Sequence, residues 1–586
     1  MAYRPDRRIC GLVLVALAFG GAVAAAPSSD SLATAAEALA RGDGIAAEVA
    51  AREALEAGAK PAQVAALIGE AELIQGDLDD ARRWLAVADF SASTRVRGFH
   101  ALARLEMQEG NLPAAGEAFD RALRAGSGNA LLWVDIGRLR YVAGQHHSVL
   151  DASTRALSLD PDDPRALEFR AQLVRDAQGA SAALPLLEHA LEAVPDDLGL
   201  LGEYAATLGE VGRHRDMLRI ARRMVEIDPR HPRAFYLQAV LAARAGLDDL
   251  ARRLMARTQG EYDTAPAGLM LTGILELRAG NAALAVGRFD ELGRRQPDNA
   301  MARLLLGRAL LANGEANEVV ARLGPAADRA DASEYLLALV GRAHEQLGRR
   351  QEAARYLDRA AAARVAPIGV LAADGGTSAA AAAVSEIRGL LAQERNAEAL
   401  NRAGALRTQF PGSIDVDVLS GDVFLLAGDP QAALAAYERA AEVRRDFALV
   451  ERMVAAQRAL GREDAALQTL ADYTARNPRS PAASAMLGRM LAENGDRERA
   501  LRLLAYARDL RPGDAALLAD LAELELAGGD AASAAETARE AYRLHRANGA
   551  VAATLARVLA ASEGGGRVAR SLTAKARTSS TALARR

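Results

Sequence analysis

A glycine that recurs every 34 residues constrains this chain more than any other feature. It stands at Gly42, Gly76, Gly110 and Gly144, and again from Gly212 to Gly348 and from Gly428 to Gly529. A polar residue usually follows it, as expected where a helix ends in a left-handed turn. Two further turns fill the gaps, at Gly179 and at 394–396, the latter after an insertion of about twelve residues. A fixed period of this length predicts a stack of identical structural units.

Two other kinds of residue recur at fixed distances from the turn glycine. A proline ends many units seventeen residues later, as at Pro161, Pro229 and Pro512. Small residues flank the turn where two helices would have to approach closely. Glycines lie seven residues before it, at Gly69, Gly137, Gly273, Gly307, Gly341, Gly421 and Gly488, and alanines lie five residues after it, at Ala81, Ala115, Ala251, Ala285, Ala353, Ala433 and Ala500. Each unit therefore reads as a pair of packed helices.

With Trp133 and Ile136-Gly137, the aromatic residues Phe119, Phe289 and Tyr437, and the closing prolines, the chain resembles the tetratricopeptide-repeat family over roughly residues 29–545. The resemblance implies an all-α, right-handed α-solenoid superhelix of about fifteen helical hairpins. It also implies a concave face lined mainly by the first helix of each pair, here called the A helix, with the second called the B helix.

Breaks in the period divide the chain. We expect an N-terminal array over 27–362, an irregular insertion or hinge over 363–385 that is rich in glycine and small polar residues, and a C-terminal array over 386–563. Continuous, lengthened helices through the insertion are an equally good interpretation. Residues 550–561 read as a capping helix. The basic tail, 564–586, is expected to be disordered or a frayed helix, with possible peripheral membrane contact through its arginines.

The first 26 residues follow the order of a secretory signal peptide. Basic residues precede the apolar run from Ile9 to Leu17, and small residues precede Pro27. Cleavage near Ala26 and a location in the periplasm or cell envelope are the expectation, and an uncleaved membrane anchor is the alternative. Cys10, the only cysteine, lies within this leader, so the remaining chain is expected to fold without disulfides.

Several classes of function are disfavoured. The formal net charge of −4 gives no concentrated basic surface for nucleic acid. The eight histidines are scattered, and the adjacent pair His146-His147 reads as a polar turn, not a metal site. No phosphate-binding loop, nucleophile elbow or zinc-protease motif occurs. We therefore expect no enzyme, no cofactor, no metal and no nucleic-acid partner.

A partner would meet the A-helix residues that face inward. Their offsets from the turn glycines select an apolar strip edged by arginine and tyrosine, a composition that suits a peptide or a helix. The alternative is that much of the strip is core between repeats. The candidate groove residues are Tyr236, Leu237, Val240, Met270, Leu271, Ile274, Leu304, Leu305, Arg308, Tyr335 and Arg342.

A second inward set is more polar and lies nearer the N-terminus. The two-carboxylate clamp of chaperone-binding members of the family, with its Lys and Asn residues on adjacent A helices, has no counterpart, so recognition of a chaperone tail is not expected. The polar set comprises His100, Arg104, Asp135, Arg138, Tyr141 and Glu168.

These observations favour a protein-binding scaffold or adaptor of the bacterial cell envelope. By analogy with exported relatives, the resemblance suggests polysaccharide export or outer-membrane assembly. The alternative is a regulatory or substrate-recruiting subunit of an envelope enzyme complex. A fused glycosyltransferase is disfavoured because no stretch outside the repeats is long enough for a nucleotide-sugar domain.

Overall fold

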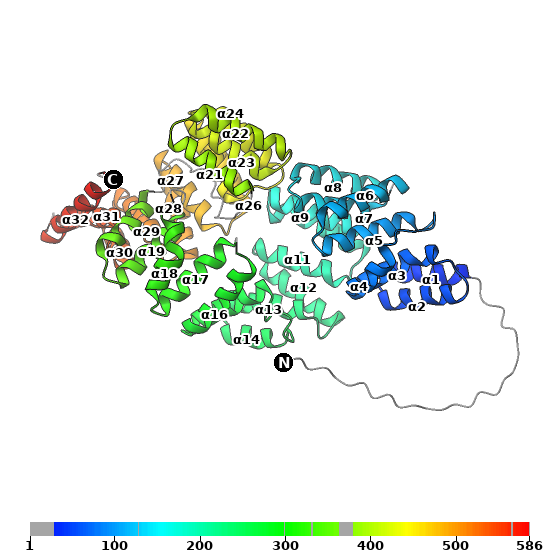
Figure 1. Ribbon diagram of the computed structural model, residues 1–586. Coiled ribbons are helices and arrows are strands. Elements are labelled where there is room, and N and C mark those ends of the chain that lie inside the picture. Colours follow the sequence, from blue (N-terminus) through cyan, green and yellow to red (C-terminus); the bar gives the residue numbers. More distant parts are fainter. Residues whose placement is uncertain are drawn as a thin grey trace, which may run out of the picture. The chain divides into compact units, whose positions relative to one another are not determined.

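The computed structural model describes residues 28–126, 128–297, 299–329, 332–362, 379–563 and 566–584. These residues form 32 helices that pack as consecutive antiparallel pairs (Figure 1). The leader predicted over 1–26 lies outside them. None of the helices in these ranges combines the length and the apolarity that crossing a bilayer requires.

The described residues form two compact units, one within 1–128 and the other within 129–586. The first unit holds three helix pairs: α1 (Ser28–Ala40) with α2 (Gly44–Glu56), α3 (Pro61–Gln75) with α4 (Leu78–Leu85), and α5 (Arg95–Gln108) with α6 (Leu112–Ala125).

The second unit begins with seven pairs that we call the first array: α7 (Ala130–Val142) and α8 (His146–Leu159), α9 (Pro164–Gln178) and α10 (Ala180–Ala193), α11 (Leu198–Glu210) and α12 (His214–Ile227), α13 (Pro232–Arg244) and α14 (Asp248–Ala256), α15 (Pro266–Arg278) and α16 (Ala282–Arg295), α17 (Ala300–Ala312) and α18 (Ala316–Ala327), α19 (Glu334–Gln346) and α20 (Arg350–Ala362).

The rest of the second unit is called the second array. It consists of α21 (Ala379–Ala392) and α22 (Asn396–Gln409), α23 (Ile414–Leu426) and α24 (Pro430–Ala441), α25 (Phe447–Ala459) and α26 (Glu463–Arg476), α27 (Pro481–Glu493) and α28 (Arg497–Leu510), α29 (Ala515–Ala527) and α30 (Ala531–Leu544), α31 (Gly549–Glu563) and α32 (Arg567–Ala584).

The turn glycines have the backbone conformation that the period predicts. Gly76 has φ +82°, its N–H donates to Leu73 O at 3.2 Å, and the next N–H, that of Asp77, donates to Glu72 O at 3.0 Å. These two hydrogen bonds close the helix end, and a φ angle in this range favours glycine. In the repeat that lacks a glycine, Glu394 takes the same role at φ +57°.

The small residues mark the closest helix contacts, as predicted. A Cβ on Gly421 would lie 2.3 Å from the ring of Tyr437, and one on Gly273 would lie 2.6 Å from the ring of Phe289. The other five glycines meet a B-helix leucine or, at Gly137, the ring of Phe169 in the next A helix, and the seven alanines after the turns have no exposed surface. Large side chains of one helix therefore fill notches in the neighbouring helix, and the core is a series of thin layers between pairs.

Two segments differ from the sequence-based expectation. Residues 379–385, which we predict to be irregular, begin α21 because the alanine run Ala379–Ala383 has high helix propensity. The basic tail is also helical: α32 packs on α31 and α20, burying Ala569 and Leu572. Lys575 donates to the carbonyl oxygen of Arg546 and to the hydroxyl of Tyr542. Residues 363–378 of the predicted hinge lie outside the described residues.

The second array docks onto the first array along contacts that we call the seam. At one end, the His147 N–H donates to Gly412 O at 3.2 Å, and the Ile414 N–H donates to His146 Nδ1 at 3.3 Å. One repeat further on, the Arg445 N–H donates to Asp176 O at 2.9 Å. After another repeat, Arg479 Nη1 lies 2.9 Å from His214 Nε2. Turns of three successive repeats in the first array thus meet loops of three successive repeats in the second.

The far end of the seam joins α19 and α20 to the loop before α31. The Ala547 N–H donates to Glu345 Oε1 at 3.0 Å, and the Gly549 N–H donates to Asp358 Oδ1 at 2.7 Å. Asn548 Nδ2 donates to Leu357 O at 2.7 Å. The pKa of Asp358 is raised because burial disfavours its charge. The two arrays therefore touch at both ends of the second array.

Candidate partner-binding surface

The apolar part of the predicted groove belongs mostly to the core between repeats. Leu237 is 4% exposed and Leu271 is 7% exposed, and both lie inside core clusters. Apart from Tyr335, the other apolar or aromatic members are partly buried and pack against these clusters: Tyr236, Val240, Met270, Ile274, Leu304 and Leu305. Tyr236 also stacks on Tyr262 with ring centroids 4.4 Å apart. The interpretation as inter-repeat core, which the sequence left open, fits this strip best.

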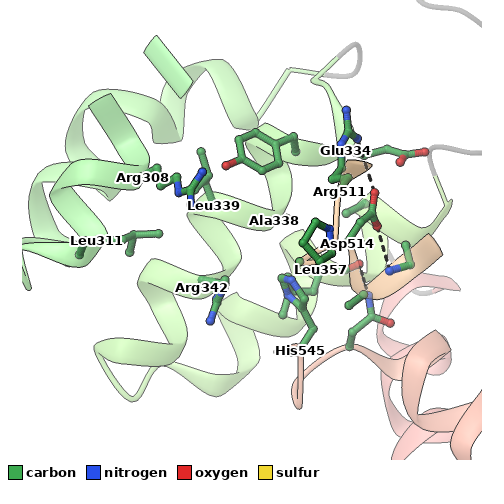
Figure 2. A pocket seen from close by; sticks show the side chains of 18 of the residues that line it. Arg308, Leu311, Glu334, Ala338, Leu339, Arg342, Leu357, Arg511, Asp514 and His545 are labelled. Atoms are coloured by element: carbon green, nitrogen blue, oxygen red, sulfur yellow. Dashed lines mark hydrogen bonds and ion pairs between the residues drawn. The ribbon is translucent and has the colours of Figure 1, made fainter. Parts of the chain in front are cut away.

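The polar residues at the edge of the predicted groove lie outside the core. Arg308 on α17 and Tyr335 and Arg342 on α19 are exposed, and all three line a cavity of about 520 Å³ (Figure 2). Leu311, Ala338 and Leu339 supply apolar wall beside them. Arg308, Tyr335 and Arg342 thus line the same cavity.

The opposite wall of the cavity comes from the second array, which the sequence does not predict. It is formed by the loop from Leu510 to Ala516, between α28 and α29, and by His545 and Asn548 before α31. Arg511 and Asp514 in the first of these loops form an ion pair at 3.5 Å. The cavity therefore exists because the seam brings two distant parts of the chain together.

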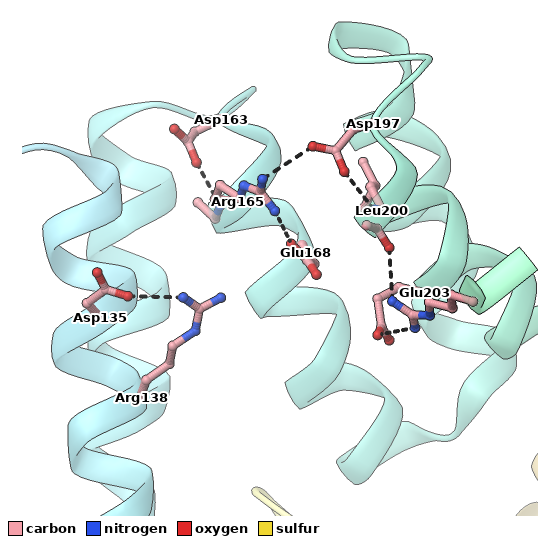
Figure 3. A network of polar contacts seen from close by, with 11 residues as sticks. Asp135, Arg138, Asp163, Arg165, Glu168, Asp197, Leu200 and Glu203 are labelled. Atoms are coloured by element: carbon pink, nitrogen blue, oxygen red, sulfur yellow. Dashed lines mark hydrogen bonds and ion pairs between the residues drawn. The ribbon is translucent and has the colours of Figure 1, made fainter. Parts of the chain in front are cut away.

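The charged members of the second, polar set on α7 and α9 are paired, either with each other or with neighbouring charges on the A helices α7 to α13 (Figure 3). Arg138 donates to Asp135 at 3.0 Å, while Arg165 contacts Glu168 at 3.4 Å and Asp197 at 3.3 Å. The network continues from Glu203 to Arg233 at 2.6 Å. Tyr141 lies edge-on to the ring of His146 at 5.3 Å. These charges satisfy one another, so this face offers less to a charged partner than the cavity does.

The members of the polar set in the first unit also have partners. Arg104 contacts Glu70 at 3.6 Å, and His100 lies against Phe119 with ring centroids 6.0 Å apart. Three carboxylates of this unit, Glu72, Asp77 and Asp80, offer oxygen atoms within 4.8 Å of one another. Asp77 accepts the Asp80 N–H as a helix cap at 3.2 Å, and Arg52 contacts Glu72 at 3.2 Å. Capping and pairing account for this cluster without a metal.

Sequence reasoning missed the role of the adjacent histidines. His146 is 7% exposed, and His147 Nε2 lies 3.1 Å from Asp417 Oδ2 in α23. The pair thus contributes to the seam, whereas the sequence analysis interprets it only as a polar turn. The adjacency of two histidines at one repeat turn is the sequence signal that could have drawn attention to the contact.

Parts of the repeat array match a known protein family. The tetratricopeptide-repeat family model matches residues 270–318, 384–447 and 486–551. No curated protein sequence matches the chain. Among solved structures, that of the APC/C hetero-tetramer Cut9–Hcn1 is 13% identical with a TM-score of 0.42, covering 95% of this chain and 94% of that one.

Two other solved structures show weaker likeness. The human IFIT1 dimer with PPP-AAAA is 16% identical with a TM-score of 0.38, covering 64% of this chain and 89% of that one. The MamA structure is 17% identical with a TM-score of 0.25, covering 28% of this chain and 97% of that one. The 34-residue period, the stacked helical hairpins and the family match over these three stretches together show an all-α solenoid that contains tetratricopeptide repeats.

Proposed function

We propose that this protein is a non-catalytic scaffold or adaptor of the bacterial cell envelope that binds a peptide segment or partner domain at the cavity beside α17 and α19. One observation carries the proposal: Arg308, Tyr335 and Arg342 are exposed side by side at a concave site with apolar walls. Aromatic residues and arginine beside an apolar pocket are the residue types that dominate protein recognition.

The envelope location is supported by the leader alone. Its basic start, apolar run and small residues before Pro27 match the layout that directs export. An exopolysaccharide or outer-membrane assembly or secretion system is the setting that we propose. Membrane contact through the basic tail has weaker support, because Lys575 is engaged with Arg546 and Tyr542 inside the protein.

Partner capture from an envelope extract tests the proposal. Arg308→Glu/Arg342→Glu is expected to retain at least about tenfold less partner than the wild type, since charge reversal repels the group that the arginines attract. The matched control, Arg253→Glu/Arg288→Glu, reverses two exposed arginines on B helices that do not line the cavity and should retain the partner.

Three outcomes would count against the proposal: equal retention by both double variants, no specific partner at all, or recovery of the chain only from the cytoplasm. A captured enzyme whose activity depends on the chain would instead support the regulatory or recruiting subunit.

A further inference from the structure

The cavity between the two arrays has the size of a ligand pocket. Its volume of about 520 Å³ falls within the range of roughly 300–1,000 Å³ that holds small ligands. A whole folded domain would not enter a space of this size, but the end of a peptide, or a few side chains of a peptide segment or partner domain, would. Figure 2 shows Arg308 and Arg342 on one side and His545 with the Asp514 loop on the other.

Arg308 and Arg342 occupy the same repeat position on successive A helices, 34 residues apart. Neither guanidinium has an ion-pair or hydrogen-bond partner among the residues that the structure describes. In the first array's earlier A helices the arginine at this position, Arg138, is held by Asp135 at 3.0 Å. The two cavity arginines thus keep their donors available.

The net charge of the cavity lining indicates which net charge a ligand should have. The lining contains three arginines, Arg308, Arg342 and Arg511, and two carboxylates, Glu334 and Asp514, so its net charge is one positive charge. A singly charged anion balances this lining, whereas a doubly charged phosphate would leave an excess of negative charge. The planar fork of arginine donates two parallel bonds to a carboxylate.

A buried polar atom next to the arginines also lacks a partner. His545 is 6% exposed, and its Nδ1 has no hydrogen-bond partner among the described residues. Burial, and then the nearby charge of Arg342, lower the pKa of His545 to about 4, so the ring is neutral at neutral pH. A neutral imidazole can donate one hydrogen bond and accept another. A ligand that reached Nδ1 would satisfy it.

We propose that this cavity binds a single carboxylate group of a peptide segment, with Arg308 and Arg342 holding the carboxylate and Leu311, Leu339 and Leu357 contacting the apolar remainder. The inference rests on the proposed function in taking a peptide as the ligand. Because one wall belongs to each array, the bound peptide also ties the second array to the first.

Short fluorescent peptides test this inference on the full chain at neutral pH. The probes are a pool with Leu, Ala and Ser in varied order that ends in a free carboxylate, the same pool amidated, and an amidated pool that carries one internal Glu or Gln. Fluorescence polarisation is expected to show binding that weakens at least about tenfold when the carboxylate is removed, or in Arg308→Glu/Arg342→Glu. Arg253→Glu/Arg288→Glu should bind as the wild type does.

The arms of the experiment separate the sources of the carboxylate. Binding by the free-ended pool alone indicates a chain terminus, and binding by the Glu pool but not the Gln pool indicates a side chain. Binding that ignores the carboxylate or the arginines, no binding up to about 1 mM peptide, or displacement by inorganic phosphate at lower concentration than by acetate would overturn the inference. If the peptides fail while partner capture still depends on Arg308 and Arg342, the scaffold proposal stands and the carboxylate inference falls.

Discussion

Replacing Asp422 by alanine is expected to lower the free energy of unfolding of the second array by about 3–5 kcal/mol, because it leaves a buried arginine without its counter-charge. Asp422 on α23 is fully buried. It accepts a hydrogen bond from the Tyr437 hydroxyl at 2.7 Å and one from Arg452 Nε at 2.9 Å. The side chain of Arg452 is only 12% exposed, so water cannot easily replace the lost carboxylate.

The same residues anchor the packing of one repeat on the next. The Tyr437 ring fills the notch left by Gly421, and its hydroxyl reaches Asp422 on the same A helix. Burial, followed by the charge of Asp422, raises the pKa of Tyr437, so the hydroxyl remains a donor. Loss of Asp422 therefore removes the group that fixes both the ring and the neighbouring helix α25.

Urea denaturation combined with hydrogen exchange is the appropriate measurement, because repeat arrays unfold in segments and a single global value is not defined for them. Tyr437→Phe removes one hydrogen bond and should cost about 1 kcal/mol. Asp422→Asn keeps the shape of the side chain, and its loss of unfolding free energy should lie between the losses for Asp422→Ala and Tyr437→Phe. A loss below about 1 kcal/mol for Asp422→Ala would show that the buried pair does not hold this repeat.

Acidification is expected to release the seam. The Ile414 N–H is a donor, so its partner His146 Nδ1 must be unprotonated, and Arg479 can only donate, so His214 Nε2 must be unprotonated too. Protonation of either histidine removes the acceptor on which its contact depends. Seam amides such as Ile414 should therefore lose hydrogen-exchange protection as the pH falls.

The surroundings of the His146 and His214 rings are consistent with loss of the seam contacts at low pH. Burial lowers the pKa of His146, against the opposing charge of Asp415 and with the help of Arg444 and His147. Burial lowers the pKa of His214 as well, and the charges of Arg479 and Arg244 add to the effect.

The sign of the pH dependence follows from these shifts. A histidine with a lowered pKa binds its proton less readily in the folded chain than in the unfolded chain. Its contribution to stability is complete above about pH 6.5, the unfolded value, and is lost as the pH falls toward the folded value. For His545, whose pKa burial and Arg342 lower, that folded value is about 4.

A matched variant isolates the histidines. His146→Gln/His214→Gln keeps a neutral acceptor at both positions and should retain seam protection as the pH falls below about 6.5, whereas the wild type loses it progressively. His147 is unchanged in both chains, so its contact with Asp417 at 3.1 Å is common to them. Equal protection of the wild type at about pH 5 and about pH 7.5, or equal loss in the Gln variant, would contradict the prediction.

The sequence predicts the repeating features of this fold because each depends on a few neighbouring residues. The left-handed turn at Gly76, the notch at Gly421 and the buried Ala433 recur with the period, and periodic positions can be assigned from one chain. The residues that line the candidate groove are harder to predict from the sequence. An error of one residue turns a helix by about 100°, enough to move Leu237 or Leu271 from a surface into the core.

The docking of the second array is not predictable from these patterns. The contacts His147–Asp417 and His214–Arg479 join residues 270 and 265 positions apart. They form at helix ends and in the loops beside them, where neither the period nor the apolar pattern carries information. For the same reason half of the cavity wall, with His545, is absent from the predicted groove, while Arg308 and Arg342 are present.

The cavity, the seam and the proposed ligand all require that the second array docks on the first. An engineered disulfide between His147→Cys and Gly412→Cys, with Cys10→Ser, tests this most directly, since a Cβ on Gly412 would lie 3.8 Å from that of His147, close to the usual disulfide spacing. The control pair is Asn281→Cys with Gly412→Cys, which shares the strain of a side chain at Gly412. Mild oxidation followed by mass spectrometry should find the 147–412 linkage and no control linkage, and no 147–412 linkage, or equal yields for the two pairs, would contradict the account.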